Sequence, residues 1–394
     1  MPVNVWIILF GTFLINAAYW MTWPFLVIIL HSRYHLSSSM IGASLSIPLV
    51  FSTLFGIYLG SISDKIGRNK IMFTGCFLSF CAYMIFVYAE ALMIYMIAIW
   101  LANIGRAILE PASKTIFGDM VTNENRASCQ QLRYFFINLG AAVGPLSVAY
   151  TGLATKQVTF LITAIAYMIY AFLLAFIFTY MKKEINATKH KNHYSFYETL
   201  SILKNDHKFL MLTLMNIFLW IIFAQFESSI AIYFSQLYGQ FSVKILGIIL
   251  FTNTLSVITL QFPLLKIVEK LHISSRIFIS IIILALSQLM FAYATSQNIS
   301  TWVISTIVFS IAEVLLVPSI NIQIDQMSPD HLRGSYFAAS FLYRLGFGAY
   351  LGGVLIQYSG TQNMFICMFF IALLTLFLYR ASFQLQSYEQ TPRC

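Results

Sequence analysis

One short charged turn, at residues 60–70, decides how the surrounding chain is organised. It reads Gly60-Ser61-Ile62-Ser63-Asp64-Lys65-Ile66-Gly67-Arg68-Asn69-Lys70. The runs on either side, 41–59 and 71–89, contain no charged residue, and apolar runs of this length are candidates for membrane-spanning helices. Because two spans joined by about ten residues must return the chain to the side it left, the turn lies at one membrane face. Its Lys and Arg side chains indicate the cytoplasmic face, where basic residues are in excess.

The composition excludes a soluble protein. Of the 394 residues, 59% are hydrophobic and 9% are charged, and the mean hydropathy is +0.79, whereas soluble domains carry about 25% charged residues. Of the 23 Lys and Arg, 16 fall in expected cytoplasmic turns or tails and three in expected outer turns, Arg33, Lys156 and Lys244. The net charge of +9 therefore reflects membrane orientation rather than a nucleic-acid partner. We expect a multi-pass protein of the inner (cytoplasmic) cell membrane, with both termini cytoplasmic.

Hydrophobic runs predict twelve membrane-spanning helices. Their approximate bounds are 5–30, 41–62, 70–89, 92–118, 129–152, 158–181, 209–235, 242–265, 275–295, 300–325, 334–357 and 362–383. The longest hydrophilic segment, 182–208, predicts a cytoplasmic linker. It separates an N-terminal six-helix bundle, 1–181, from a C-terminal six-helix bundle, 209–394, which ends in a short cytoplasmic tail. The first apolar run has no small-residue cleavage site, so we expect it to remain as the first span.

The two expected bundles repeat one another in sequence. Pro111 and Asp119, at the end of the fourth span, recur as Pro318 and Asp325 at the end of the tenth, 207 and 206 positions later. Landmarks that recur at one shift indicate an internal duplication. Parallel halves of six spans, related by an axis along the membrane normal, are one way in which transporters are built.

The turn at residues 60–70 resembles the loop signature of the major facilitator superfamily, G-x-x-x-D-x-x-G-R-x-K/R, which lies between the second and third spans. The matching positions are Gly60, Asp64, Gly67, Arg68 and Lys70. The resemblance implies an all-α membrane protein of two pseudo-symmetric six-helix bundles. It also implies that these five residues form a gating motif, whose Asp and Arg latch the two halves on the cytoplasmic side. A generic basic turn that contains a glycine is the alternative.

A second motif lies in the fifth span. Gly140, Gly144 and Pro145 resemble the antiporter motif of the same family, G-x-x-x-G-P-x-x-x-G, although Val148 and Ala149 stand where the last glycine is usual. Small residues four positions apart allow close helix contact, and proline removes a backbone hydrogen bond and can kink a helix. In the family this motif accompanies export by exchange. Ordinary small-residue packing is the alternative.

Charged side chains inside apolar spans are costly and mark functional sites. Arg106, Glu110 and Lys114 follow at i, i+4 and i+8 in the fourth span, so they share one helix face. Glu313, in the tenth span, lies 207 positions after Arg106, so the repeat places the two equivalently near mid-membrane. The helices that carry them line the central cavity in the resembling family. We expect Glu313 to titrate there, and Arg106 to pair with it or to hold substrate. The alternatives are a static buried ion pair and pairing of Arg106 with Glu110 alone.

A further acid and an aromatic group are candidates in the first and seventh spans. Shifted by 207 positions, Glu227 falls on Trp20, beside Tyr19 and Trp23. Both spans line the cavity in the resembling family, so we expect the acid and the rings to share its outer half. Aromatic faces bind cations. The alternatives are that Glu227 caps a helix near the outer surface, and that the rings only pack or contact lipid.

Two more arginines lie in spans. Arg344, beside Tyr343, is near mid-membrane in the eleventh span, whereas Arg133 is close to the cytoplasmic end of the fifth and is expected to reach that surface by snorkelling. If most of these charges point inward, the cavity is positive and favours an anionic or carboxylate-bearing substrate. The chain also departs from drug–proton antiporters, which usually carry an arginine early in the fourth span. That place is Ile99 here, so the proton-relay role of the family's arginine does not transfer to Arg106.

The sequence shows no phosphate loop, nucleophile elbow or metal-binding helix. His31 and His35 are four positions apart in an outer turn but have no third ligand, and the five cysteines show neither disulfide nor metal spacing. We therefore expect no enzyme activity, cofactor or metal.

The resulting prediction is a monomeric secondary transporter with alternating access. We expect proton-coupled export, by antiport, of a small organic compound or drug, so that its partners are substrate, protons and the lipid bilayer. One alternative is the same fold transporting an anionic metabolite or siderophore, by uptake or export. A receptor or an intramembrane enzyme on the same scaffold is the other.

Overall fold

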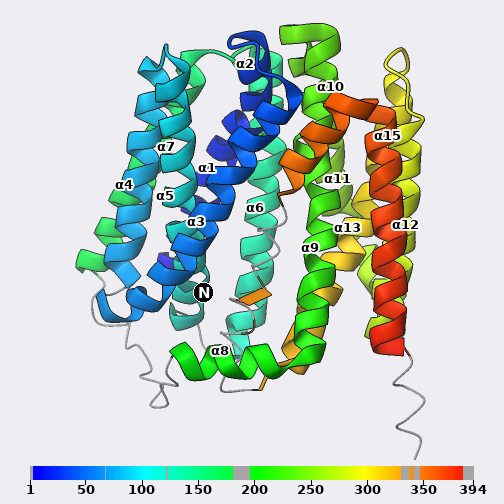
Figure 1. Ribbon diagram of the computed structural model, residues 1–394. Helices are drawn as coiled ribbons and strands as arrows, with labels where there is room; N and C mark the ends of the chain where they lie inside the picture. Colours follow the sequence, from blue (N-terminus) through cyan, green and yellow to red (C-terminus); the bar gives the residue numbers. More distant parts are fainter. Residues whose placement is uncertain are drawn as a thin grey trace, which may run out of the picture. The chain divides into compact units, whose positions relative to one another are not determined.

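The computed structural model describes residues 3–66, 68–120, 123–180, 196–329, 336, 339–340 and 347–384. The regular elements of these residues are helical (Figure 1). In chain order they are α1 (Val3–Thr22), η1 (Trp23–Phe25), α2 (Leu26–Ser32), α3 (Ser38–Ile66), α4 (Arg68–Tyr88), α5 (Leu92–Met120), α6 (Asn123–Thr151), α7 (Gln157–Tyr180), α8 (Phe196–Asn205), α9 (His207–Glu227), α10 (Ser229–Tyr238), η2 (Gly239–Phe241), α11 (Ser242–Val268), α12 (Ile273–Ala292), α13 (Ile299–Met327), α15 (Gly348–Tyr379) and η4 (Arg380–Gln384).

Eleven segments of the described residues are long and apolar enough to cross a membrane. The first ten follow the first ten predicted spans in order. The last, Gly348–Ser382, contains the end of the eleventh predicted span and the twelfth, which meet at Gly360, where a φ of 82° interrupts the helical backbone. Most of the beginning of the eleventh span lies outside the described residues. The all-α prediction is confirmed, and the twelve-span count agrees with this arrangement.

Two spans that the sequence predicted as continuous are broken. The first changes to a 3-10 turn at η1, where Pro24 has no backbone N–H to donate. The seventh is interrupted at Ser228, between α9 and α10. The Ser228 hydroxyl donates to the carbonyl of Ala224 at 2.7 Å, and such back-bonding by Ser or Thr bends helices.

The chain forms two compact units. The first comprises Met1–Lys189 and Ala231–Phe251, and the second comprises His190–Ile230 and Thr252–Cys394. Residues 231–251, from α10, η2 and the start of α11, therefore pack with the first unit. Within the first unit, α1 lies against α6 and α7, and α4 lies against α5 and α7 (Figure 1). Within the second, α12 packs on α13 and α15, and α15 packs on α9.

One close helix contact occurs in both units. In the first, Gly140 and Gly144 of α6 meet α1, and a Cβ added at Gly144 would collide with the carbonyl oxygen of Ala17. In the second, Gly348 and Gly352 of α15 meet α9. The α15 glycines lie 208 positions after those of α6. Because only small residues let two backbones approach this closely, the repeat is visible in packing as well as in sequence.

The partner helices repeat at the same spacing. Gly144 meets Ala17, and Gly352 meets Gln225, 208 positions after Ala17. This shift is one position larger than the 207 that relates the fourth and tenth spans. Glu227 therefore corresponds to Tyr19 rather than to Trp20, which corrects the sequence-based pairing by one residue.

Candidate functional site

In the first unit, Arg106 lies against aromatic residues at the break in the first span, where α1 gives way to η1. Its Cζ is 3.5 Å from the ring centroid of Tyr19, well within the range of a cation–π interaction. Tyr19 stacks on Trp23 of η1, with centroids 5.4 Å and planes 17° apart. Three residues that the sequence singled out, from α1, η1 and α5, thus form one cluster. We call Arg106, Tyr19 and Trp23 the arginine–aromatic cluster.

Two buried tyrosines lie behind this cluster. Tyr83 of α4 and Tyr167 of α7 stack with centroids 5.5 Å apart and planes 16° apart. The hydroxyl of Thr22 donates to Tyr83 Oη at 3.4 Å. Sequence reasoning missed this pair because the chain is 16% aromatic, so a single tyrosine in a span carries no signal.

The other charges of the fourth and fifth spans lie nearer the cytoplasmic ends predicted for these helices. Glu110 follows Arg106 by one turn of α5 and is partly exposed. Arg133 of α6 is 7% exposed and donates from Nη2 to Ser113 Oγ at 3.2 Å. The expectation that Arg133 snorkels to the surface is therefore wrong. Ser113 supplies a hydrogen bond that holds the guanidinium inside the unit.

In the second unit, Glu313 of α13 is held by a side chain of α11. Asn253 Nδ2 donates to Glu313 Oε2 at 2.9 Å and also to Ser310 Oγ at 3.0 Å. Ser310 lies nearly one turn before Glu313 on α13 and donates to the Thr306 carbonyl at 2.8 Å. Glu313 is partly exposed. We call Asn253, Ser310 and Glu313 the carboxylate cluster. Sequence reasoning missed Asn253, although an amide inside an apolar span was a signal that could have been used.

Glu227 is the last residue of α9 and is partly exposed. Two positions earlier, the side chain of Gln225 is fully buried. Gln225 Nε2 donates to the carbonyl of Gly348 at 2.9 Å, and Gln225 Oε1 accepts from the hydroxyl of Ser229 at 2.6 Å. An amide therefore joins α9, α10 and α15 at the break in the seventh span.

The residues that resemble the antiporter motif lie at helix contacts. Gly140 and Gly144 pack on α1. Ala149, in the region where the last glycine is usual, faces Gly247 of α11, at which an added Cβ would lie 2.6 Å from Ala149 Cβ. The helix α6 continues past Pro145 to Thr151, so this proline does not end it.

Most of the signature turn lies outside the part of the chain whose side chains the structure describes. Six of the residues singled out from the sequence have side chains outside the described part of the structure: Gly60, Asp64, Gly67 and Arg68 of the signature turn, Lys114 of the fourth span and Arg344 of the eleventh. The backbone is helical up to Ile66 and again from Arg68, so the expected turn of about ten residues is mostly helix. Lys70 is exposed.

The Major Facilitator Superfamily model matches residues 8–346. The chain belongs to this superfamily. It is 29% identical over 364 residues to the uncharacterized MFS-type transporter YqjV of Bacillus subtilis, which covers 91% of this chain and 87% of that protein. It is 24% identical over 369 residues to a Na(+), Li(+), K(+)/H(+) antiporter of Planococcus maritimus, covering 86% and 85% of the two chains.

Solved structures show the same fold. The nucleoside transporter NupG aligns with a TM-score of 0.76 at 15% identity, over 97% of this chain and 100% of that one. A POT family transporter crystallised with 5-aminolevulinic acid aligns with a TM-score of 0.79 at 16% identity, over 99% and 97%. Membership of the superfamily, together with the eleven apolar segments found in the described residues, makes the chain a multi-pass secondary transporter of the membrane.

Proposed function

We propose that the chain exports a small organic compound or drug in exchange for protons, by alternating access. The observation that carries this proposal is the carboxylate cluster. A carboxyl group within an apolar membrane helix is costly and is retained for function. Asn253 holds it by an amide hydrogen bond at 2.9 Å. The amide of Asn253 fixes the orientation of the Glu313 carboxylate but supplies no positive charge to neutralise it. We therefore propose that Glu313 is neutralised by binding a proton, which it releases during the transport cycle.

The arginine–aromatic cluster is the proposed substrate site of the first unit. The rings of Tyr19 and Trp23 offer apolar faces, and both side chains are partly exposed. Aromatic faces bind the planar, apolar bodies of many organic compounds. Glu110 and Glu227, each partly exposed on its own helix, are further candidates for contact with substrate or proton. Arg344 is proposed on sequence grounds alone.

Three features support exchange in the outward direction. Gly140, Gly144 and Pro145 resemble the antiporter motif, and the two glycines hold α6 tightly against α1. One relative exchanges alkali cations for protons. The excess of basic residues in the expected cytoplasmic turns favours cytoplasmic termini. We propose the halves 1–181 and 209–394 as the parts that move, with the gating motif at residues 60–70 between the cytoplasmic ends.

The experiment is gradient-driven transport by the purified full-length protein in proteoliposomes. Ethidium represents cationic drugs and citrate represents polycarboxylates, each with and without a proton gradient. We expect the proton gradient to drive ethidium transport against the concentration gradient of ethidium. Glu313→Gln should abolish this coupling between proton movement and ethidium transport. Glu269→Gln is the matched control, since Glu269 is an exposed acid of the same unit. Equal coupling in wild type and Glu313→Gln would remove Glu313 from the mechanism.

A second candidate function is transport of an anionic metabolite or siderophore. The observation that favours it is Arg106, a cation placed against Tyr19 within a membrane span. Gradient-dependent movement of citrate that is lost in Arg106→Gln, with no movement of ethidium, would establish this function in place of drug export.

A further inference from the structure

A cavity of about 320 Å³ lies at one end of the first unit, away from the turn at residues 60–70. Its polar lining comes from Ser32, Arg33, Tyr95, Thr155 and Gln157. The sources are the end of α2, the start of α5 and the connection between α6 and α7. Phe86 and Phe160 add an aromatic wall and stack with centroids 4.9 Å apart. The cavity lies wholly within the first unit and includes none of the residues proposed above for transport.

One polar group that lines this cavity, the hydroxyl of Tyr95, has no hydrogen-bond partner among the described residues. Tyr95 is 1% exposed. The Tyr95 ring is fixed from two sides, by Phe86 at 4.8 Å and by Tyr34 at 5.5 Å between centroids. Buried hydroxyls are nearly always hydrogen-bonded. A fixed, buried donor that faces a cavity therefore indicates a missing acceptor.

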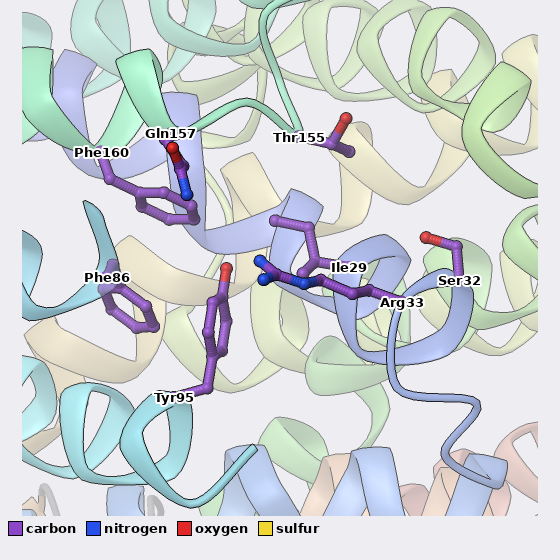
Figure 2. Close-up of a pocket in the computed structure, with 8 residues that line it drawn as sticks. All are labelled: Ile29, Ser32, Arg33, Phe86, Tyr95, Thr155, Gln157 and Phe160. Carbon is purple, nitrogen blue, oxygen red and sulfur yellow. The ribbon is translucent and has the colours of Figure 1, made fainter. Parts of the chain in front are cut away.

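The charge at the cavity is positive. Figure 2 shows the guanidinium group of Arg33 beside the hydroxyl end of Tyr95, with the amide of Gln157 nearby. Arg33 is exposed, so a ligand can reach it from outside the unit. Burial raises the pKa of the neighbouring Tyr34 phenol, which donates to the carbonyl of Glu90 at 2.9 Å. Tyr34 therefore stays neutral and adds no negative charge beside Arg33.

We propose that this cavity binds an oxyanion, a carboxylate or a phosphate, carried on a compact aromatic or apolar body. Arg33 supplies a planar fork of donors that matches both groups. Tyr95 supplies a preoriented hydroxyl donor, and the stacked rings of Phe86 and Phe160 contact the body. The volume is at the lower limit of small-molecule sites, which restricts the body to about the size of one ring. Because basic turns place the opposite end in the cytoplasm, the site faces outward, where the anion is either a free solute or a lipid headgroup.

The test uses isothermal titration calorimetry on the full-length protein in detergent. The probes are benzoate and phenyl phosphate, with phenyltrimethylammonium as the cation of matching size. We expect both anions to bind and the cation not to bind. Arg33→Gln should weaken anion binding by at least about tenfold, as expected for loss of a charged hydrogen-bonding partner. Lys156→Gln is the matched control, because Lys156 is an exposed cation of the same connection that does not line the cavity.

Tyr95→Phe is the second variant. It keeps the ring contacts and removes a hydroxyl that has no hydrogen-bond partner among the residues that the structure describes, so the melting temperature without ligand should not fall. Binding of phenyl phosphate should weaken by about tenfold. Equal binding of the cation probe, unchanged anion affinity in both Arg33→Gln and Tyr95→Phe, or an equal loss in Lys156→Gln would overturn the proposal.

A competition experiment distinguishes the two sources of the anion. Phosphatidylglycerol added to the detergent solution should displace phenyl phosphate if the site takes a lipid headgroup, whereas phosphatidylcholine should not. If neither lipid displaces the probe, the ligand is a free solute. Both results require the same Arg33 and Tyr95 donors and so support an oxyanion site.

Discussion

Replacing Gly247 by Ala tests how the start of α11 packs in the first unit. A Cβ built at Gly247 lies 2.6 Å from Ala149 Cβ, whereas carbon atoms in contact prefer about 3.5–4.0 Å. The helices α6 and α11 must therefore separate by about 1 Å to admit one methyl group. Overpacking of this kind costs about 1–3 kcal/mol.

The sign of the effect distinguishes packing from helix propensity. Within a helix, Gly to Ala alone should stabilise by about 0.5–1 kcal/mol, so a loss of stability in Gly247→Ala must come from the contact with Ala149. Ala149→Gly removes the opposing methyl group. The double variant exchanges the two residues and should recover most of the loss, because both total volume and total helix propensity are unchanged.

The assay is thermal unfolding of the four proteins in one detergent, followed by transport in proteoliposomes. We expect Gly247→Ala to melt several degrees below wild type and the double variant to return close to it. Transport should fall with Gly247→Ala, because the proposed cycle must make and break the packing of residues 231–251 on the first unit. A Gly247→Ala protein that is more stable than wild type, or a double variant no better than the single, would refute the contact.

Three further predictions concern contacts within single units. Gly144→Ala should destabilise by about 1–3 kcal/mol, because its Cβ collides with the carbonyl of Ala17, whereas the neighbouring exposed Val143→Ala should cost less; equal melting temperatures would contradict this. A double-mutant cycle between Arg106→Gln and Tyr19→Leu should give a coupling energy of about 0.5–2 kcal/mol from the cation–π contact, and a coupling near zero would exclude it. Gln225→Leu should lower stability by about 1–3 kcal/mol, since it leaves the Gly348 carbonyl without its buried donor; a melting temperature at or above wild type would show that this amide is dispensable.

Most of the fold could be predicted from the length of the apolar runs and the spacing of small residues. Uncharged apolar runs such as 71–89 are long enough to cross the hydrocarbon core of a bilayer, so they are assigned as membrane-spanning helices. The breaks at Pro24 and Ser228 were missed because a single residue bends a helix without changing the hydropathy around it. The shift that relates the two halves is 207 positions for the fourth and tenth spans but 208 for the first and seventh. Landmarks on the fourth and tenth spans alone could not reveal this difference.

The candidate site, too, was predicted only in part from the sequence. The charges Arg106 and Glu313 were visible because an ionised side chain stands out in an apolar run. Their partners were not, since Asn253 is 60 positions from Glu313 and Tyr83 is one aromatic residue among many. Which neutral side chain meets a charge depends on helix packing, and that information is not local in sequence.

The measurement that tests the central claim most directly compares two modes of transport by Glu313→Gln in the same proteoliposomes. Substrate counterflow at equal pH needs only the rearrangement of the protein, whereas accumulation driven by a pH gradient also needs the proton site. The account predicts that Glu313→Gln retains counterflow of the transported compound and loses gradient-driven accumulation. Accumulation at the wild-type level in Glu313→Gln would contradict it.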